Sequence, residues 1–572
     1  MLTKLIIRNF KLFEEIEIEL GNRVLFIGPN NSGKTSALQA LAVWKIGLDK
    51  WLEKRGAGPV PAKRPGVTIN RRDFISVPVP AANLLWRNLK VRQGVKKEGK
   101  NSTQNILIDI IVEGISNGKE WRCGFEFDYA NEESLYCRSL RTNDGNRMGV
   151  PEEVRGLSVA FLPPMSGLAA NETRIDTGAI NVRIGEGRTA EVLRNLCYDI
   201  HSASDKRENW GQINEHMQSL FGVSINDPVY IQERGEIRLD YTDRQGNRLD
   251  ISASGRGQQQ TLLLLAYMFT HPHSILLLDE PDAHLEILRQ GQIYDLLGDI
   301  AEQQQLQIIA ASHSEMLLNR ARDKDIVVAF VGKPHRIDDR GSQVMKALKD
   351  IGFEHYAQAE ERGWVLYLEG STDQAILKRF AHILKHEAEQ FLNNAYVHYV
   401  GNQPKKAEKH FFGLREAKSD LVGIGIYDRL ERELPENSFL KHIMWNKKEI
   451  ENYLCTEDVL LAYAEAKGRE MGGELFAQSW RQSMEESIGE IENALQTLNK
   501  SPWGDDIKAS DEFLDPLFEK FYEKLGLDNL MRKTNYHELA SFIRPEDIHD
   551  DVKNVLDNIV EVAKKAGTNI LM

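Results

Sequence analysis

A loop near the N-terminus has the residue types and spacing of a phosphate-binding site. Gly28-Pro-Asn-Asn-Ser-Gly-Lys-Thr35 fits the pattern G-x-x-x-x-G-K-[ST] and follows the apolar run Val24–Ile27. Backbone N–H groups of such a loop, and of the helix that follows it, surround the phosphates of a nucleotide. We expect Lys34 to reach the β- and γ-phosphates of ATP and the Thr35 hydroxyl group to bind Mg²⁺. The predicted ATP-binding residues of this loop are Gly28, Asn30, Asn31, Ser32, Gly33, Lys34, Thr35 and Ser36.

Two carboxylates end another apolar run far downstream. Asp279 and Glu280 follow Ile275-Leu-Leu-Leu, a pattern that predicts a buried strand. We expect Asp279 to hold the Mg²⁺ ion of ATP and Glu280 to polarise the water that attacks the γ-phosphate. The next apolar run ends in Ser-His313-Ser, and His313 is expected to hydrogen-bond the γ-phosphate. Lys34, Glu280 and His313 are therefore the predicted catalytic residues of an ATPase.

A second anion site is predicted where Ser252-Ala-Ser254-Gly255-Arg256 opens an apolar helix. The N-terminus of a helix that begins with small residues attracts phosphate groups. Because residues 28–35 already hold the phosphates of their own nucleotide, we expect Ser254 and Gly255 to contact a nucleotide bound to a second copy. This hypothesis predicts a homodimer or a higher homo-oligomer.

The hydrophobic pattern indicates which elements position these residues. Alternating apolar residues near the N-terminus predict strands, and residues 258–355 alternate between helix and apolar strand. A new α/β unit begins near Trp364, and an amphipathic helical tail follows residue 460. The expected fold is α/β, with a head over residues 1–355 that contains a mixed insertion at about 45–250, a second α/β domain over 361–460, and a helical region over 461–572.

The order of these motifs resembles that of the ABC ATPases of the SMC and Rad50 type. The opening Ile7-Arg-Asn-Phe10 is also similar to the first strand of that family. The resemblance covers about residues 1–355. It implies a mixed sheet, a parallel core that carries the phosphate loop, and two heads that enclose two ATP molecules. Arg256 departs from the pattern, because the family often has glycine there.

Acidic residues in the second α/β unit follow the predicted strands Val365–Leu368 and Leu421–Ile426. Acidic side chains at neighbouring strand ends can converge on Mg²⁺ or Mn²⁺, and such ions support phosphodiester cleavage. The alternative for Glu369 is that it is an ordinary acidic residue on the surface with no metal-binding role. The pattern resembles a Toprim domain. The candidate ligands are Glu369, Asp373 and Asp428, with Glu431 and Glu451 as weaker candidates.

An ABC head followed by a Toprim domain is the layout of the overcoming-lysogenization-defect (OLD) endonuclease family, which includes the A subunit of the Gabija antiphage system. The similarity in this half covers about residues 361–460 and part of the tail near Lys533. It implies an ATP-controlled, metal-dependent DNA endonuclease in bacterial antiphage defence. Leu430 is a departure, because the family usually has a second aspartate there. Two alternatives stay open: a nuclease-inactive ATPase sensor or scaffold that holds and releases a separate effector, nuclease or helicase, and a repair-type head without its coiled coil.

Charge is distributed unevenly along the chain. The net charge is −13, yet residues 50–100 contain thirteen basic and three acidic residues, so this segment is +10 and the remainder −23. Such a segment suits DNA, with Trp86 packing beside the duplex, whereas a solvated loop or a subunit contact is the alternative. The four cysteines lack metal-site spacing, and no apolar run approaches the roughly 20 residues that span a bilayer. We therefore expect a cytoplasmic protein with reduced thiols and no membrane contact.

Overall fold

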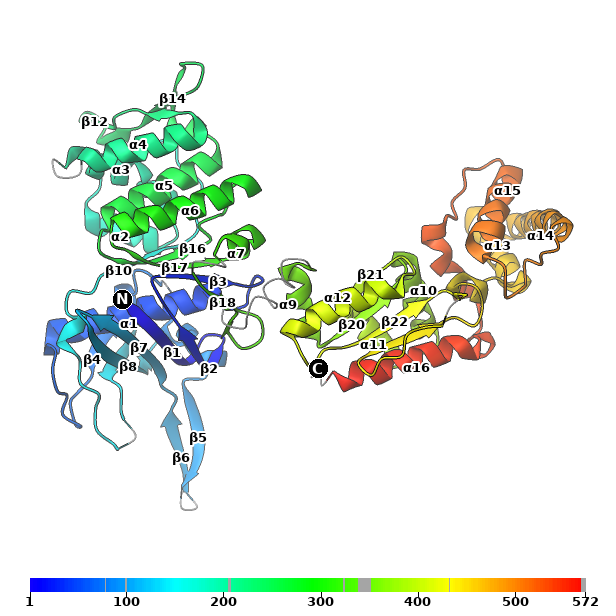
Figure 1. Cartoon of the computed structure of the whole chain (residues 1–572), viewed down its shortest axis with the longest axis horizontal. Helices are drawn as coiled ribbons and strands as arrows, with labels where there is room; N and C mark the ends of the chain where they lie inside the picture. Colours follow the sequence, from blue (N-terminus) through cyan, green and yellow to red (C-terminus); the bar gives the residue numbers. More distant parts are fainter. Residues whose placement is uncertain are drawn as a thin grey trace. The chain divides into compact units, whose positions relative to one another are not determined.

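The chain folds into two compact units, Met1–Met345 and Lys346–Met572, each with its own sheet and apolar core. Figure 1 shows the course of the chain in both units. The computed structural model describes residues 1–77, 79–97, 100–142, 144–203, 207–321, 325–337, 351–431 and 433–566.

The first unit contains a six-stranded sheet in the order β10-β16-β17-β3-β18-β19. Neighbouring strands run parallel, except that β19 is antiparallel to β18. Apolar residues on the central strands are buried on both faces, as is typical of a parallel sheet between two layers. The predicted parallel core that carries the phosphate loop is thus confirmed. The strands are β3 (Arg23–Ile27), β10 (Val159–Leu162), β16 (Ile275–Asp279), β17 (Gln307–Ser312), β18 (Ile326–Ala329) and β19 (His335–Arg336).

Helix α1 (Lys34–Arg55) lies between the parallel sheet and a second sheet (Figure 1). This second sheet is antiparallel and has six strands in the order β2-β1-β7-β8-β9-β4. The helix contacts strands of both sheets, and one apolar core joins the three layers. Trp44 and Trp51 fill this core from α1, and Nε1 of Trp44 donates to the carbonyl oxygen of Cys123 at 3.0 Å. The strands are β1 (Leu2–Phe10), β2 (Phe13–Glu19), β4 (Val67–Asn70), β7 (Ile108–Ser116), β8 (Lys119–Asn131) and β9 (Ser134–Ser139).

Helices cover the face of the parallel sheet that is opposite α1 (Figure 1). They are α2 (Thr177–Gly185), α3 (Leu193–Ser202), α4 (Arg207–Phe221), α5 (Arg256–Thr270), α6 (Ile287–Gln303) and α7 (Glu315–Ala321). Short strands complete the unit: the hairpin β5 (Arg92–Lys97) with β6 (Lys100–Asn105), and β11 (Ser224–Ile225), β12 (Val229–Ile231), β13 (Glu236–Arg238), β14 (Asp240–Thr242) and β15 (Arg248–Asp250).

The second unit is built on four parallel strands in the order β21-β20-β22-β23. Helices α9 and α12 cover one face, and α10, α11 and α16 cover the other (Figure 1). The strands are β20 (Trp364–Leu368), β21 (Tyr396–Tyr399), β22 (Val422–Tyr427) and β23 (Leu440–Met444). The helices are α9 (Phe353–Arg362), α10 (Ser371–Ile383), α11 (Ala388–Asn393), α12 (Pro404–Ala417) and α16 (Asp550–Lys565).

The C-terminal helices share the apolar core of this sheet, which extends in sequence from Trp364 to Ala563. Polar contacts also join the two parts, because the buried hydroxyl group of Tyr453 donates to Asp551 of α16. The helical region and the α/β region therefore fold as one unit. The remaining helices among its described residues are η8 (Ile450–Tyr453), α13 (Glu457–Gly472), α14 (Glu474–Thr497), η9 (Ala509–Leu514), α15 (Asp515–Leu525), η10 (Lys533–Phe542) and η11 (Pro545–Asp547).

Neither a membrane-spanning helix nor an exposed thiol is present among the described residues. Among the described residues, no helix combines the length and the apolar character needed to cross a bilayer. The thiols of Cys123, Cys137, Cys197 and Cys455 are free and buried. Burial raises the pKa of the Cys123 thiol to about 12, so this group is protonated and unreactive at neutral pH.

Candidate functional site

The loop between β3 and α1 has backbone geometry that depends on two glycines. Gly33 adopts a φ of 101°, and a Cβ atom there would lie 2.7 Å from the ring of Phe13. A Cβ atom at Gly28 would lie 2.7 Å from the carbonyl oxygen of Phe330. Asn31 also adopts a positive φ, of 62°. The loop is thus held in a tight curve that residues with larger side chains cannot follow.

Lys34 begins α1, and its ammonium group lies inside the curve of this loop. Nζ donates to the carbonyl oxygens of Gly28 at 2.7 Å and Pro29 at 2.8 Å. Burial lowers the pKa of Lys34, and the charges of Glu280 and Asp279 oppose this shift. The lysine therefore lies close to both predicted acids, although about 250 residues separate them in the sequence. This arrangement of charges suits a triphosphate with its magnesium ion.

Thr35 and Asp279 form the part of the site that fits Mg²⁺. Oγ1 of Thr35 donates to Oδ2 of Asp279 at 2.9 Å and lies 3.1 Å from Oδ1. Burial raises the pKa of Asp279 to about 6, and the hydrogen bond from Thr35 partly offsets that effect. A hydroxyl group and a carboxylate in contact supply hard oxygen ligands, which Mg²⁺ prefers. The donor set therefore fits the predicted ion.

Glu280 and His313 follow the adjacent strands β16 and β17. Glu280 has a φ of 49°, and its N–H group donates to the carbonyl oxygen of Ala311 at 2.8 Å. Nδ1 of His313 lies 3.6 Å from Oε1 of Glu280. The side chains are 55% exposed for His313 and 34% exposed for Glu280, so both remain accessible to water. The two predicted catalytic groups meet at the carboxyl edge of the parallel sheet.

The segment that precedes α5 is held by hydrogen bonds within the chain. Oγ of Ser254 donates to the carbonyl oxygen of Ile251 at 2.7 Å, and Nε2 of Gln259 donates to the carbonyl oxygen of Ser254 at 3.0 Å. Gly255 and Arg256 are exposed where α5 begins. Ser254 itself is buried, so the part of this helix start that is accessible to a ligand carried by another molecule is Gly255 and Arg256.

Asp282 is a member of this edge that sequence analysis did not predict. The carboxyl group of Asp282 is buried and forms a hydrogen bond with the side chain of Ser312. Its Oδ1 atom has no hydrogen-bond partner among the described residues. Burial raises its pKa. The apolar run ends at Leu278, and Asp282 lies four residues further along the chain. The hydrophobic pattern therefore did not indicate that Asp282 belongs to the site.

The acidic residues of the second unit meet at the carboxyl end of its parallel sheet. Glu369 follows β20 and Asp428 follows the neighbouring strand β22. Burial, and then a hydrogen bond and repulsion from Glu369, raise the pKa of Asp428. Oδ2 of Asp373 accepts the N–H groups of Glu369 at 3.0 Å and Gly370 at 3.3 Å. Burial and the charge of Glu369 raise the pKa of Asp373 to about 6.

Two glutamates of the segment Glu449-Ile-Glu451 complete this group. Burial, and then the charges of Glu449 and Asp373, raise the pKa of Glu451 to about 8. Glu449 was not predicted as a ligand, yet its charge also raises the pKa of Asp428. Its position two residues before Glu451 was the available signal. We name as the acidic cluster the five residues Glu369, Asp373, Asp428, Glu449 and Glu451.

Lys533 of η10 brings positive charge to the acidic cluster. Burial lowers the pKa of Lys533, but the charge of Glu451, an ion pair with Asp511 at 3.2 Å and the charge of Glu449 raise it overall. Nζ also donates to Oγ of Ser510 at 3.0 Å. More than 80 residues separate Lys533 from Glu451, so only the fold shows that they are neighbours. Carboxylate oxygens are the ligand type that Mg²⁺ or Mn²⁺ prefers, but among the residues that the structure describes no three carboxylates of the cluster place oxygens within 4.8 Å of one another.

Glu431 differs from the acidic cluster in its exposure to solvent. Glu431 is exposed and Leu430 is partly buried. The N–H group of Arg429 donates to the carbonyl oxygen of Lys448 at 3.0 Å, which fixes the chain where it leaves β22. Glu449 thus supplies a buried carboxylate near Asp428 that Glu431, at the surface, does not.

The basic segment over residues 50–100 extends over the end of α1, strand β4 and the β5–β6 hairpin. Ion pairs within the chain neutralise some of its charge: Lys50 with Asp73 at 3.2 Å, Arg71 with Glu133 at 3.1 Å, and Arg87 with Glu14 at 2.9 Å. The expectation that Trp86 packs beside DNA is wrong. Trp86 is 1% exposed, and its Nε1 donates to the carbonyl oxygen of Ile106 at 2.6 Å. Its ring belongs to the core beneath the antiparallel sheet.

Comparison with known families identifies the class of the first unit. Residues 1–112 match the AAA ATPase domain family. Residues 208–319 match the family described as "AAA domain, putative AbiEii toxin, Type IV TA system". The first match contains the loop at residues 28–35, and the second contains Asp279, Glu280 and His313. The first unit is therefore an ATPase domain, as predicted.

Individual relatives match this chain over limited regions or at low identity. It is 33% identical over 97 residues to the zinc import ATP-binding protein ZnuC of Wolbachia sp. subsp. Brugia malayi (strain TRS), which is 16% of this chain and 38% of that protein. The chain thus spans well under half of that relative.

Among solved structures, the SMC head domain from Thermotoga maritima has 13% identity and a TM-score of 0.32, over 59% of this chain and 98% of that one. The Pyrococcus furiosus Smc head domain with an extended coiled coil, bound to the C-terminal domain of ScpA, has 12% identity and a TM-score of 0.34, over 61% and 99%.

Proposed function

We propose that the chain binds and hydrolyses ATP as a head dimer, and that nucleotide state controls a Toprim-like, metal-dependent DNA endonuclease unit. The observation that carries this proposal is the acidic cluster. One chain combines an ATPase domain with five acidic residues at the carboxyl edge of a second parallel sheet. The layout resembles that of the OLD family and supports a role in bacterial antiphage defence.

ATP hydrolysis in this proposal depends on groups that already lie together. Lys34 would contact the phosphates, and Thr35 and Asp279 would hold Mg²⁺, which would neutralise part of the phosphate charge. Glu280 orients the attacking water. His313, 3.6 Å from Glu280, supports the same water or the γ-phosphate.

A second copy would complete each nucleotide site through Ser254 and Gly255. The exposed start of α5 packs against residues 284 and 285, since a Cβ atom at Gly257 would lie 3.2 Å from the carbonyl oxygen of His284. Ile287 and Leu288 follow, and these apolar side chains are 67% and 80% exposed. Exposed apolar residues beside a polar site support a protein contact there.

Sedimentation analysis with ATP tests this dimer. Glu280→Gln should slow hydrolysis and accumulate the dimer, whereas adding Gly255→Asp should repel the partner's phosphates and leave a monomer that still binds ATP. A double variant that dimerises like Glu280→Gln alone would contradict the proposed contact.

DNA cleavage would use the acidic cluster, with Glu369, Asp428 and Glu451 as the main ligands of Mg²⁺ or Mn²⁺. When bound, such an ion activates water and stabilises the leaving oxygen. The basic segment over residues 50–100 would contact the phosphate backbone of DNA. Binding should therefore weaken steeply with salt, and a gel-shift assay that detects no affinity at low salt would contradict this role.

A plasmid assay with the full chain tests the endonuclease directly. We expect Mn²⁺- or Mg²⁺-dependent nicking of supercoiled DNA that is lost in Glu369→Ala and retained in Glu431→Ala, an exposed acid outside the cluster. Lys34→Ala should abolish ATP hydrolysis and remove the effect of ATP on nicking. Loss of phage protection in both Glu369→Ala and Lys34→Ala cells would support the defence role.

The second candidate function is a sensor or scaffold without nuclease activity. Leu430, at a position where a Toprim nuclease usually has aspartate, and Lys533, which partly neutralises the cluster, favour this alternative. Active ATP hydrolysis together with no nicking under either metal would support it. A separate effector protein, nuclease or helicase that co-purifies with the wild type and dissociates upon ATP binding would then identify the released partner.

A further inference from the structure

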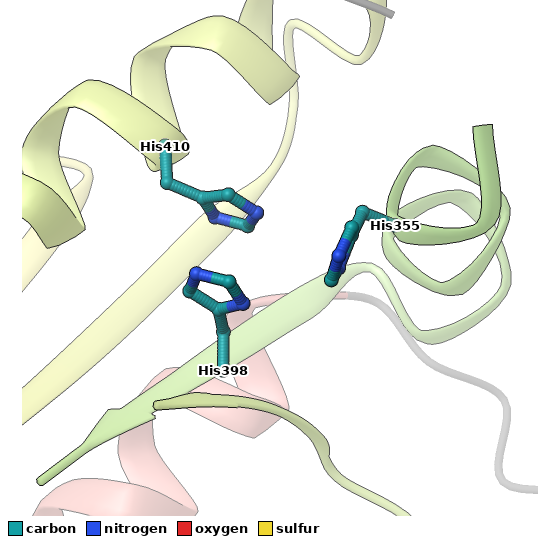
Figure 2. Close-up of side chains that lie close together, drawn as sticks. All are labelled: His355, His398 and His410. Carbon is teal, nitrogen blue, oxygen red and sulfur yellow. The ribbon is translucent and has the colours of Figure 1, made fainter. Parts of the chain in front are cut away.

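Three histidines from separate elements of the second unit, none of them a member of the acidic cluster, converge on one another. His355 lies on α9, His398 on β21 and His410 on α12, and Figure 2 shows the three rings around a common space. One ring nitrogen from each residue lies within 4.8 Å of the other two. This is the one group of three or more potential metal ligands at such short separation among the residues that the structure describes.

Two tyrosines orient these rings from the neighbouring strands. The hydroxyl group of Tyr396 lies 2.8 Å from Nδ1 of His355, and that of Tyr367 lies 2.9 Å from Nδ1 of His410. A histidine that binds a metal typically uses its other ring nitrogen in a hydrogen bond, which fixes the ring and its tautomer. The tyrosine contacts thus leave Nε2 of His355 and His410 for a ligand, although Nε2 of His410 also lies 3.4 Å from the Tyr396 hydroxyl group.

The surroundings of His398 and His410 favour the neutral form of these two rings. Burial, and then repulsion from the other two histidines, lower the pKa of His410 to about 3. Burial likewise lowers the pKa of His398. A neutral imidazole retains the lone pair that a metal requires.

One adjustment is needed before all three lone pairs converge. The rings of His398 and His410 are stacked, with centroids 3.8 Å apart and planes at 5°. His355 is nearly perpendicular to both, at 89° and 88°. The torsion angle about the bond between the β-carbon and the ring covers a broad range in histidine. Rotation of one stacked ring about this bond can therefore direct its nitrogen toward the common space.

We propose that His355, His398 and His410 form a binding site for one Zn²⁺ ion. Three imidazoles with an open fourth position are an established zinc ligand set, and imidazole suits Zn²⁺ far better than Mg²⁺. The site therefore differs in chemistry from the acidic cluster, whose oxygens favour Mg²⁺ or Mn²⁺. Because the ligands come from two helices and a strand, the ion ties α9 and α12 to the sheet.

Zinc titration of the full, untagged chain after chelator treatment tests this site. Competition with a chromophoric chelator should reveal one tight site per chain. His355→Ala and His410→Ala should each weaken it at least about 100-fold, and Tyr396→Phe about 10- to 100-fold. His442→Ala is the matched control, because His442 is also partly buried and contacts a tyrosine, Tyr427, at 3.1 Å. Glu369→Gln should also retain zinc binding, which separates this site from the acidic cluster.

Equal zinc affinity in the wild type and both histidine variants would overturn the proposal, as would an equal loss in His442→Ala. If the alanine variants unfold, cobalt bound to the wild type provides a second measurement. X-ray absorption that shows three imidazole ligands would support the site, and oxygen-only ligation would overturn it. Neither result depends on whether the chain cleaves DNA.

Discussion

Binding of Mn²⁺ to the acidic cluster should release protons. Burial and mutual repulsion raise the pKa of Glu451 to about 8 and shift that of Asp428 in the same direction. A hydrogen bond between the carboxyl groups of Asp428 and Glu369 also requires a proton on one of them. At pH 7 the metal-free cluster therefore holds protons that a divalent cation has to displace.

The size of this effect follows from linkage between protons and metal. A cation that displaces one proton gains about tenfold in affinity per pH unit below the pKa of the group, and the gain levels off above it. The pKa of about 8 for Glu451 thus predicts a roughly 50-fold increase in Mn²⁺ affinity between pH 6 and pH 8. Release of a second proton, from Asp428, makes the dependence steeper.

The stability of the metal-free protein should fall as the pH rises, whereas its Mn²⁺ affinity should increase. The folded-state pKa of Glu451 is raised above its ordinary value of 4.5, so the native state holds a proton that the unfolded chain releases. The contribution of this group to stability is present below about pH 4.5 and is lost as the pH rises toward 8. Saturating Mn²⁺ should remove that loss.

Calorimetric titration in buffers with different ionisation enthalpies measures the number of protons released. We expect a value near one or above for the wild type at pH 7. Glu369→Gln should lower it, since the glutamine removes a repelling charge beside Asp428. Glu431→Gln, at the surface, should not change it. Mn²⁺ affinity that stays constant between pH 6 and pH 8, with no proton release, would refute the reasoning.

Three further predictions concern other parts of the chain. Glu280→Gln should lower kcat for ATP hydrolysis by about 10²- to 10⁴-fold while ATP affinity in a nucleotide-binding assay is retained, and wild-type turnover would exclude the general-base role. Gly33→Ala should weaken ATP binding about tenfold or more. The positive φ at this position costs alanine about 1–2 kcal/mol, and the new Cβ atom would lie 2.7 Å from Phe13. Unchanged binding would show that the loop can adopt a different backbone conformation and still bind ATP. Tyr453→Phe should lower the free energy of unfolding by about 1–3 kcal/mol in urea denaturation, since it removes a buried hydrogen bond to Asp551, and an unchanged value would show that another donor replaces it.

The nucleotide site was predictable because its parts are local. Residues 28–35 form one uninterrupted loop, and Asp279 and Glu280 directly follow an apolar run. Strand order then brings these segments together, since β3 and β16 both pair with β17 in the parallel sheet. Parallel strands place their carboxyl ends at one edge, so motifs at strand ends predict a shared site even across a long insertion.

Residues that act through tertiary packing were not predictable in the same way. The sequence near Lys533 resembles the OLD family, but it did not indicate which residues this lysine lies beside, and only the fold brings it near Glu451. The three histidines are separated by 43 and 12 positions, and no local pattern connects them. Trp86 was misinterpreted because its basic neighbours suggested a surface, whereas the core beneath the antiparallel sheet required a large apolar side chain.

The tail helices have a chemical role as well as a structural one. Lys533 acts on the charges of Glu451 and Glu449 from η10, a segment that packs against α10, the helix that follows Glu369, and against α13. Withdrawal of η10 by a few ångströms would remove counter-charge from the carboxylates and strengthen their attraction for a divalent cation. A partner that bends the tail can therefore set metal occupancy at the sheet edge without touching the ligands themselves.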